Sequence, residues 1–289
     1  TNAIQKLMAK LHLFTIGILS MLLFAIISCS PLATQGPEPA FLNIAAIEFI
    51  HDFEKGPRLH QIDHVEIFFE NFSIGYYELP AEIAVIPTKE VSNLTIRPAI
   101  RENGGKNTIT VYNMMTSYIV DQTFEAFETY EINPQVDYAS NVVFDLVETF
   151  ESSNSMTFDL DGIDSTMLVR TTKDANDGSY SGLLSSENGR DILVGSDFLF
   201  TDLDNDRRDV FIEFEYRNDI PFEIGMYAFG GGNSLEIPYI FTFPARAQWN
   251  KVYLNFTPAI FNIPSEGYRI FLRTNSSSSF LSEVFIDNL

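Results

Sequence analysis

The sequence predicts an all-β protein built from two sandwiches in tandem. Short runs of alternating apolar and polar residues recur along the chain, as in His64–Glu70, and this period of two is typical of strands with one buried side. Turn sequences rich in Gly, Asn and Asp separate the runs, among them Asn103-Gly104-Gly105 and Asp177-Gly178. No segment longer than about ten residues keeps a helical period. The 26 Phe and 12 Tyr residues also suit β-rich cores.

The first segment, residues 1–28, has the organisation of an export signal. Lys6 and Lys10 precede an uncharged apolar run from Leu13 to Ile27. That run fits the roughly 7–15 residues of a signal-peptide core and is shorter than the ~20 residues that span a bilayer. We therefore expect a signal peptide, with a plain transmembrane anchor as the alternative.

The apolar run ends in Ile26-Ile27-Ser28-Cys29, and Cys29 is the only cysteine of the chain. This sequence resembles the lipobox of bacterial lipoproteins, in which a peptidase cuts before a cysteine that becomes lipidated. The resemblance implies a lipid anchor on Cys29 that holds the protein at a membrane. Ser30 rather than Asp follows the cysteine, which in that family implies sorting to the outer membrane. Because no acidic cluster follows, we expect the protein to face the periplasm rather than the cell surface.

Residues 29–40 form a predicted tether, which Pro31, Pro37 and Pro39 keep extended. The whole chain carries 18 Lys and Arg against 39 Asp and Glu. Such a negative field repels nucleic acid and anionic lipid, and it favours cations or uncharged ligands. The solubility of an exported protein explains the same excess without any ligand. A nucleic-acid partner is therefore not expected.

Residues 41–138 contain about seven short strand candidates, a number and spacing typical of an immunoglobulin-like sandwich. They include Ile83–Ile86, Leu94–Ile100 and Thr108–Tyr112. The patterns ELPAEIAV and LTIRPAI in this stretch are similar to small β-domains of surface lipoproteins. That resemblance names no functional residue.

Residues 139–289 hold a second series of strand candidates, which begins with Asn141–Phe150, includes Phe222–Tyr227 and Tyr268–Arg273, and ends with Glu283–Ile286. Their number and the turns between them predict a jelly-roll sandwich. Val147–Glu151, Gln248–Leu254 and Phe285–Asn288 follow one another in an order that resembles galactose-binding-like jelly rolls of carbohydrate-binding modules. The resemblance implies a non-catalytic domain that binds a carbohydrate.

Three acidic residues, Glu148, Glu151 and Asp287, are the first candidate metal site. In the jelly rolls that this region resembles, the first and last strands lie side by side and often hold a structural cation. Neighbouring carboxylates repel one another without a counter-ion, and calcium takes such oxygen ligands. The resemblance thus implies a structural calcium ion, although function requires no cofactor. Solubility of an edge strand is the alternative explanation.

Asp202, Asp204 and Asp206 are the second candidate metal site, with Glu213 at the twelfth place as in an EF-hand loop. Arg207 stands where that loop needs glycine, and a strand pattern follows it. We therefore expect a solvated acidic turn, with a looser calcium loop as the alternative.

Tyr227, Phe229 and Tyr239 are the candidate ligand-binding residues. They lie near Gly230-Gly231-Gly232, where glycine lets a backbone approach a ligand closely. A flexible hairpin is the competing explanation for these glycines. Trp249 is expected in the core rather than on a platform for a sugar.

The sequence lacks the common catalytic motifs. No histidine follows His64, so the jelly roll has no Ser-His-Asp or Cys-His arrangement. His60 and His64 are four residues apart, but Gln61 stands where a zinc-protease motif needs Glu. A glycosidase needs only two carboxylates, and nothing in the sequence singles out such a pair. We therefore expect a protein that is not an enzyme.

The sequence thus predicts a lipid-anchored, non-enzymatic envelope protein whose jelly roll binds a carbohydrate. The alternative is a scaffold lipoprotein that binds an envelope protein, and a remote alternative is a glycoside hydrolase or an accessory protein of one. The expected partners are the membrane, through the lipid on Cys29, and either a glycan or an envelope protein.

Overall fold

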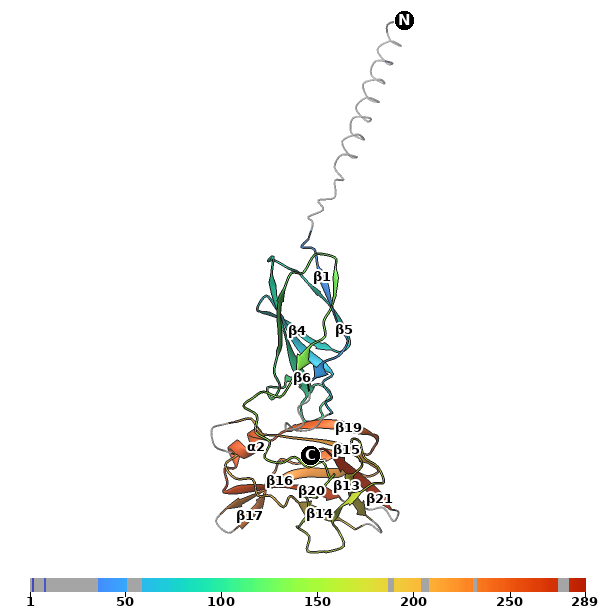
Figure 1. The fold of residues 1–289 in the computed structure, drawn as a ribbon, viewed down its shortest axis with the longest axis vertical. Coiled ribbons are helices and arrows are strands. Elements are labelled where there is room, and N and C mark those ends of the chain that lie inside the picture. Colours follow the sequence, from blue (N-terminus) through green and yellow to red (C-terminus); the bar gives the residue numbers. More distant parts are fainter. Residues whose placement is uncertain are drawn as a thin grey trace. The chain divides into compact units, whose positions relative to one another are not determined.

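Within the part of the chain that the structure describes, regular structure is almost entirely β-strand (Figure 1). The computed structural model describes Asn2, Met8 and residues 36–50, 59–186, 190–203, 208–230, 233–274 and 281–289. Contacts divide the chain into two units, residues 1–39 and Ala40–Leu289, and the strands named below belong to the second. Among the described residues, no helix has the length and apolar character needed to cross a membrane.

The first ten strands of this unit form the first sandwich. They are β1 (Ala40–Ile44), β2 (Glu48–Phe49), β3 (His64–Phe69), β4 (Phe72–Glu78), β5 (Ala81–Val85), β6 (Ser92–Arg101), β7 (Ile109–Val111), β8 (Tyr118–Gln122), β9 (Thr129–Glu131) and β10 (Gln135–Val136). One sheet has the order β5-β1-β9, and the other has the order β4-β3-β6-β7 with β8 also paired to β6. A short separate pair joins β2 to β10.

The core of the first sandwich lies between these two sheets. Leu94 and Ile96 of β6 are buried, while the residues that alternate with them are partly exposed. Ile67 of β3 lies on the same side, and Leu42 of β1 meets them from the other sheet. In β6 the period of two in the sequence therefore corresponds to one buried side, whereas β3 is buried on both sides.

The remaining strands form the second sandwich. They are β11 (Phe158–Asp159), β12 (Leu168–Thr171), β13 (Ser181–Ser186), β14 (Ile192–Gly195), β15 (Phe211–Asn218), β16 (Phe222–Gly230), β17 (Asn233–Glu236), β18 (Phe241–Phe243), β19 (Arg246–Asn255), β20 (Gly267–Thr274) and β21 (Ser282–Asp287), with the short helix α2 (Thr257–Asn262) before β20. A six-stranded sheet has the order β11-β14-β20-β16-β17, with β18 also paired to β16. The five-stranded sheet has the order β12-β13-β21-β15-β19.

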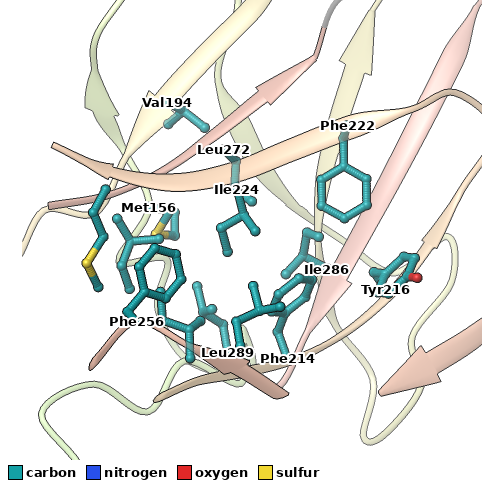
Figure 2. Close-up of a cluster of buried hydrophobic side chains, with 14 of the residues drawn as sticks. Met156, Val194, Phe214, Tyr216, Phe222, Ile224, Phe256, Leu272, Ile286 and Leu289 are labelled. Carbon is teal, nitrogen blue, oxygen red and sulfur yellow. The ribbon is translucent and has the colours of Figure 1, made fainter. Parts of the chain in front are cut away.

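The second sandwich is a jelly roll. From β13 through β14, β15, β16, β19, β20 and β21, the chain alternates between the two sheets, which is the arrangement of that fold. Phe214 and Ile286 from one sheet pack against Ile224 and Leu272 from the other (Figure 2). The predicted fold class is therefore confirmed.

One strand prediction is wrong. Asn141–Phe150 contains no strand and is a connecting segment. Its apolar residues alternate because Val143 is exposed while Phe144 packs edge-on against Tyr138. Its only ladder-like contact among the described residues is at Glu148, whose backbone N–H and C=O bond to Leu289. The predicted limits of the signal peptide, the tether and the two sandwiches stay predictions.

Candidate functional site

The outward side of the six-stranded sheet carries a strip of aromatic and charged side chains. The alternation in β16 sends Phe222, Ile224 and Met226 into the core. The same alternation turns Tyr227 and Phe229 to the opposite side, where both are partly exposed. Two of the three predicted ligand-binding residues therefore share one face.

The neighbouring strand β20 completes this face. Arg269 lies opposite Tyr227, and Phe271 lies opposite Gly225. On the other side of β20, β14 brings Gly195 beside Phe271 and leads on to Phe158 of β11. We call Phe158, Tyr227, Phe229, Arg269 and Phe271 the outer strip.

Glycine in β16 makes room for the largest ring of the outer strip. A Cβ atom built on Gly225 would lie 2.6 Å from Cζ of Phe271. Because glycine has no side chain, the ring of Phe271 can lie across the backbone of the neighbouring strand at this position. Phe271 is fully buried, and its ring centroid lies 5.0 Å from that of Tyr227. The buried ring of Phe271 therefore supports the partly exposed ring of Tyr227.

Arg269 lies at the centre of the outer strip between two rings. Its guanidinium carbon lies 3.8 Å from the centroid of Phe158 and 5.9 Å from the centroid of Phe229. Its Nη1 donates hydrogen bonds to the carbonyl oxygens of Ser196 and Asp197, the latter at 2.8 Å. Cation–π contact and backbone bonds together fix the orientation of this side chain.

A second arginine is held at one end of the strip. Arg273 donates from Nε to Oε2 of Glu223 at 2.7 Å, and its Nη2 lies 2.6 Å from the same oxygen. Its guanidinium carbon lies 5.3 Å from the centroid of Phe271. The outer strip thus combines flat apolar rings with oriented donors and an acceptor, which are the groups that bind a polyhydroxylated ring.

The third predicted ligand-binding residue lies elsewhere. Tyr239 packs against the core, with its ring centroid 5.3 Å from that of Phe241 and 6.0 Å from that of Phe256. Trp249, expected in the core, is instead half-buried, and its Nε1 donates to Oδ1 of Asp174 at 3.3 Å.

The acidic residues of the first candidate metal site each bond to backbone amides. Glu148 is buried, and its two carboxylate oxygens accept from the N–H groups of Phe150 and Ser155, both at 2.6 Å. Glu151 accepts from the N–H groups of Ser179 and Tyr180, both at 2.8 Å. These carboxylates therefore hold loops in place.

Asp287, the third acid of this site, is fully buried. Its Oδ2 accepts from the N–H groups of Asn176 at 2.9 Å and Asp177 at 3.2 Å. Burial raises the pKa of Asp287 to about 7, and the negative charge of Glu215 acts in the same direction. Among the described residues, no three His, Cys, Asp or Glu side chains are arranged to hold a metal ion. The calcium ion stays a prediction.

The other predicted residues are described only in part. Asp202 is exposed and has a φ of 62°, whereas Asp204, Asp206 and Cys29 lie outside the described residues. The acidic turn and the lipidation site are therefore untested predictions.

The unit Ala40–Leu289 also contains a cavity of about 660 Å³. Its lining includes Tyr138, Phe144, Phe198 and Glu213. Glu213 is already held by Tyr112, whose hydroxyl donates to Oε1, and by Tyr138, whose hydroxyl lies 3.0 Å from Oε2. The carboxylate is thus engaged within the protein, and the outer strip remains the better candidate for ligand binding.

Sequence reasoning missed Phe158, Arg269 and Phe271. The strand Tyr268–Arg273 was predicted without an assignment of its two sides, although Arg269 and Phe271, two residues apart, lie on the same side of a strand. The missing information was the order of strands in the sheet, which places β20 between β14 and β16.

Comparisons with known proteins give structural likenesses only. No protein-family model matches the sequence, and no curated protein matches it. A C-terminal family 22 carbohydrate-binding module of Clostridium thermocellum Xyn10B is similar at 15% identity and a TM-score of 0.35, over 52% of this chain and 93% of that chain. The CBM22-1 xylan-binding domain of Paenibacillus barcinonensis Xyn10C gives 14% identity and a TM-score of 0.31, over 49% of this chain and 92% of that chain. A carbohydrate-binding module of the β-sandwich superfamily gives 9% identity and a TM-score of 0.34, over 78% of this chain and 82% of that chain. Values this low carry no ligand or site residue over to this chain.

Proposed function

We propose that this protein binds a carbohydrate on the outward side of the six-stranded sheet, without catalysing a reaction. The observation that carries this proposal is the arrangement of Phe158, Tyr227 and Phe229 around Arg269. Sugar rings present C–H groups that pack on aromatic faces, and their hydroxyl groups accept hydrogen bonds from a guanidinium. The strip offers both kinds of contact on one rigid sheet.

The charges of the strip favour binding over hydrolysis. Hydrolysis of a glycosidic bond needs two carboxyl groups on either side of that bond. Glu223, the carboxylate of β16 on this face, is bonded to Arg273 and serves as its partner. An uncharged polysaccharide also suits a chain with an excess of acidic residues, because it is not repelled by the negative field.

The proposal is tested by retention of the protein on a panel of immobilised polysaccharides. We expect saturable retention on one class of glycan, and at least a tenfold loss of affinity in Tyr227→Ala and in Phe158→Ala. The matched control is Tyr76→Ala, because Tyr76 is an exposed tyrosine of β4 in the first sandwich, away from the strip. Unchanged affinity in both strip variants, with folded protein throughout, would contradict the proposal.

We also propose that the protein is exported and held at the outer membrane, facing the periplasm, by a lipid on Cys29. The lipobox-like sequence Ile26-Ile27-Ser28-Cys29 supports this. In bacteria fed a labelled fatty acid, the native protein should incorporate the label and Cys29→Ala should not. Label in both proteins, or in neither, would overturn the assignment of Cys29 as the anchor.

A further inference from the structure

Three connections of the first sandwich meet at the end of the sandwich where β1 begins. Ala40, the first residue of β1, lies opposite Val85, the last residue of β5. The N–H of Phe41 donates to the carbonyl of Glu128 at 2.9 Å, so the connection from β8 to β9 lies beside the start of β1. The N–H of Glu70 donates to the carbonyl of Asn93 at 2.8 Å, which places the turn between β3 and β4 there as well. We call the connections 70–72, 86–91 and 123–128 the entry tip.

Buried contacts make the entry tip a single structure. The carboxylate of Glu70 accepts from the hydroxyl of Ser92 at 2.6 Å, from the N–H of Thr88 at 2.8 Å and from the hydroxyl of Thr88. These bonds, that of Ser92 first, lower the pKa of Glu70 to about 2, so it stays ionised and bonded at any physiological pH. The ring of Phe124 lies 5.4 Å from that of Phe69, which attaches the third connection to the core.

The entry tip presents four large apolar side chains to the surroundings. Their exposed fractions are 75% for Phe72, 67% for Phe127, 53% for Val91 and 45% for Ile86. Isolated exposed apolar residues are common on protein surfaces. Here, each of the three connected segments contributes at least one of them, and together they form an apolar end.

Phe127 is held in an unfavourable backbone conformation. It is the third residue of a turn in which the N–H of Glu128 donates to the carbonyl of Glu125 at 3.3 Å, and its φ is 66°. Glycine or asparagine usually occupies a turn position with positive φ, whereas a bulky side chain there costs stability. A strained position that keeps a large exposed aromatic side chain points to a use for that side chain.

The chain before β1 indicates what this end faces. Residues 30–39 connect Cys29 to Ala40. An extended chain spans at most about 3.3–3.6 Å per residue. The eleven steps from Cys29 to Ala40 therefore keep the start of β1, beside the entry tip, within roughly 40 Å of Cys29. This step rests on the proposed lipid anchor and is independent of the proposed carbohydrate binding.

We propose that the entry tip inserts Phe72, Ile86, Val91 and Phe127 into the interfacial region of a lipid surface with no net charge. Aromatic and aliphatic side chains partition into the boundary between headgroups and acyl chains, and such contacts reinforce a lipid anchor. The same connections carry Glu70, Glu90, Glu125 and Glu128 against Lys89. This excess of negative charge disfavours anionic lipid, so the surface that fits is zwitterionic.

The test places a fluorescent residue in the tip of the full chain. Phe127→Trp and Phe72→Trp are each made in a Trp249→Phe background, so that one tryptophan reports. Phe261→Trp in the same background is the matched control, because Phe261 is 61% exposed but belongs to α2 in the second sandwich. Each protein is reconstituted with phosphatidylcholine vesicles whose acyl chains are brominated, and co-sedimentation with the vesicles is measured in parallel.

We expect both tip tryptophans to lose at least half of their emission to the brominated lipid and the control tryptophan to lose less than a tenth. Adding phosphatidylglycerol at a third of the lipid should reduce the quenching at residue 127. Proteins that co-sediment while both tip tryptophans stay unquenched would overturn the tip contact alone and would favour a protein partner for this end. Proteins that stay in the supernatant would contradict both the tip contact and the membrane anchoring. Quenching that appears only with phosphatidylglycerol would overturn the choice of a zwitterionic surface.

Discussion

Asp287 is the residue whose protonation is expected to shape the pH dependence of stability. It is fully buried, and burial raises its pKa to about 7 in the folded protein, above the ordinary value of 3.8. The folded state therefore binds this proton more tightly than the unfolded state. The contribution of Asp287 to the free energy of unfolding is largest below about pH 4 and falls as the pH rises towards 7. We expect Asp287→Asn, which cannot ionise, to flatten this fall when Tm is measured between pH 4.5 and 7.5.

The same measurement tests the predicted calcium ion. A cation beside Asp287 and Glu151 would favour the ionised carboxylates and so stabilise the protein at neutral pH. Calcium should then raise the Tm of the native protein above its value in chelator. The corresponding increase in Tm should be smaller for Asp287→Asn. Equal values of Tm in calcium and in chelator would contradict the prediction. An unchanged pH dependence in Asp287→Asn would contradict the titration of this residue.

At the scale of one element, β16 depends on glycine at its centre. The ring of Phe271 occupies the space in which a side chain on Gly225 would lie, with a contact of 2.6 Å to the first added carbon. Gly225→Val should therefore displace that ring and destabilise the protein by about 1–3 kcal/mol, the usual cost of overpacking. Because Phe271 supports Tyr227, the variant should also lose affinity for the glycan.

Urea unfolding and glycan retention measure the two effects of Gly225→Val. Gly36→Ala is the control, because no atom lies within 4 Å of a Cβ built there. A variant with native stability and native retention would show that Phe271 can move without cost. Lost stability with native retention would mean that the outer strip is not the binding surface.

The sequence predicted what alternation alone determines. The period of two identified Phe222–Tyr227 and Tyr268–Arg273 as strands. It also misassigned Asn141–Phe150, because a connecting segment that packs Phe144 and exposes Val143 has the same local pattern as a strand. Periodicity describes one strand at a time and does not report whether a partner strand exists.

The position of each strand in its sheet is a long-range property, and the candidate site depends on it. Arg269 of β20 meets Phe158 of β11 because β14 pairs with both of these strands. The two residues are far apart in the sequence. Tyr239 follows the glycine-rich turn closely, yet its ring packs against Phe256. The positive φ of Phe127 could not be predicted from the residue type either, because glycine or asparagine usually occupies a position with that conformation.

At the scale of the whole unit Ala40–Leu289, a partly buried carboxylate joins the two sandwiches. Tyr112 and Tyr138 of the first sandwich donate hydroxyl groups to Glu213 of β15, and Nζ of Lys251 lies 3.4 Å from Oε2 of the same carboxylate. Burial is the main cause that raises the pKa of both tyrosines, so they remain protonated donors. Tyr253 of β19 packs beside Tyr112, at 5.0 Å between ring centroids.

Backbone bonds reinforce the same contact. The N–H of Asn103 donates to the carbonyl of Tyr253 at 2.9 Å, and the N–H of Gln61 donates to the hydroxyl of Tyr253 at 3.1 Å. The N–H of Asn255 donates to Oδ1 of Asn103 at 2.8 Å. Contacts of this kind fix one arrangement of the two sandwiches, and we therefore expect them to unfold together.

Glu213→Ala is the substitution that tests this coupling. It removes the acceptor of two buried hydroxyl groups and leaves Lys251 with Glu215, 3.8 Å away, as its remaining ion-pair partner. Breaking a buried charged pair costs about 3–5 kcal/mol, and this partly exposed pair should cost no more than that. Calorimetry should show one transition for the native protein and two for Glu213→Ala, because the sandwiches then lose their shared contact. Glu213→Gln keeps an oxygen acceptor for a tyrosine hydroxyl and should stay closer to the native curve.

Two transitions in the native protein would show that the sandwiches unfold independently. A single unshifted transition in Glu213→Ala would show that the apolar contacts around Tyr253 join them without the carboxylate.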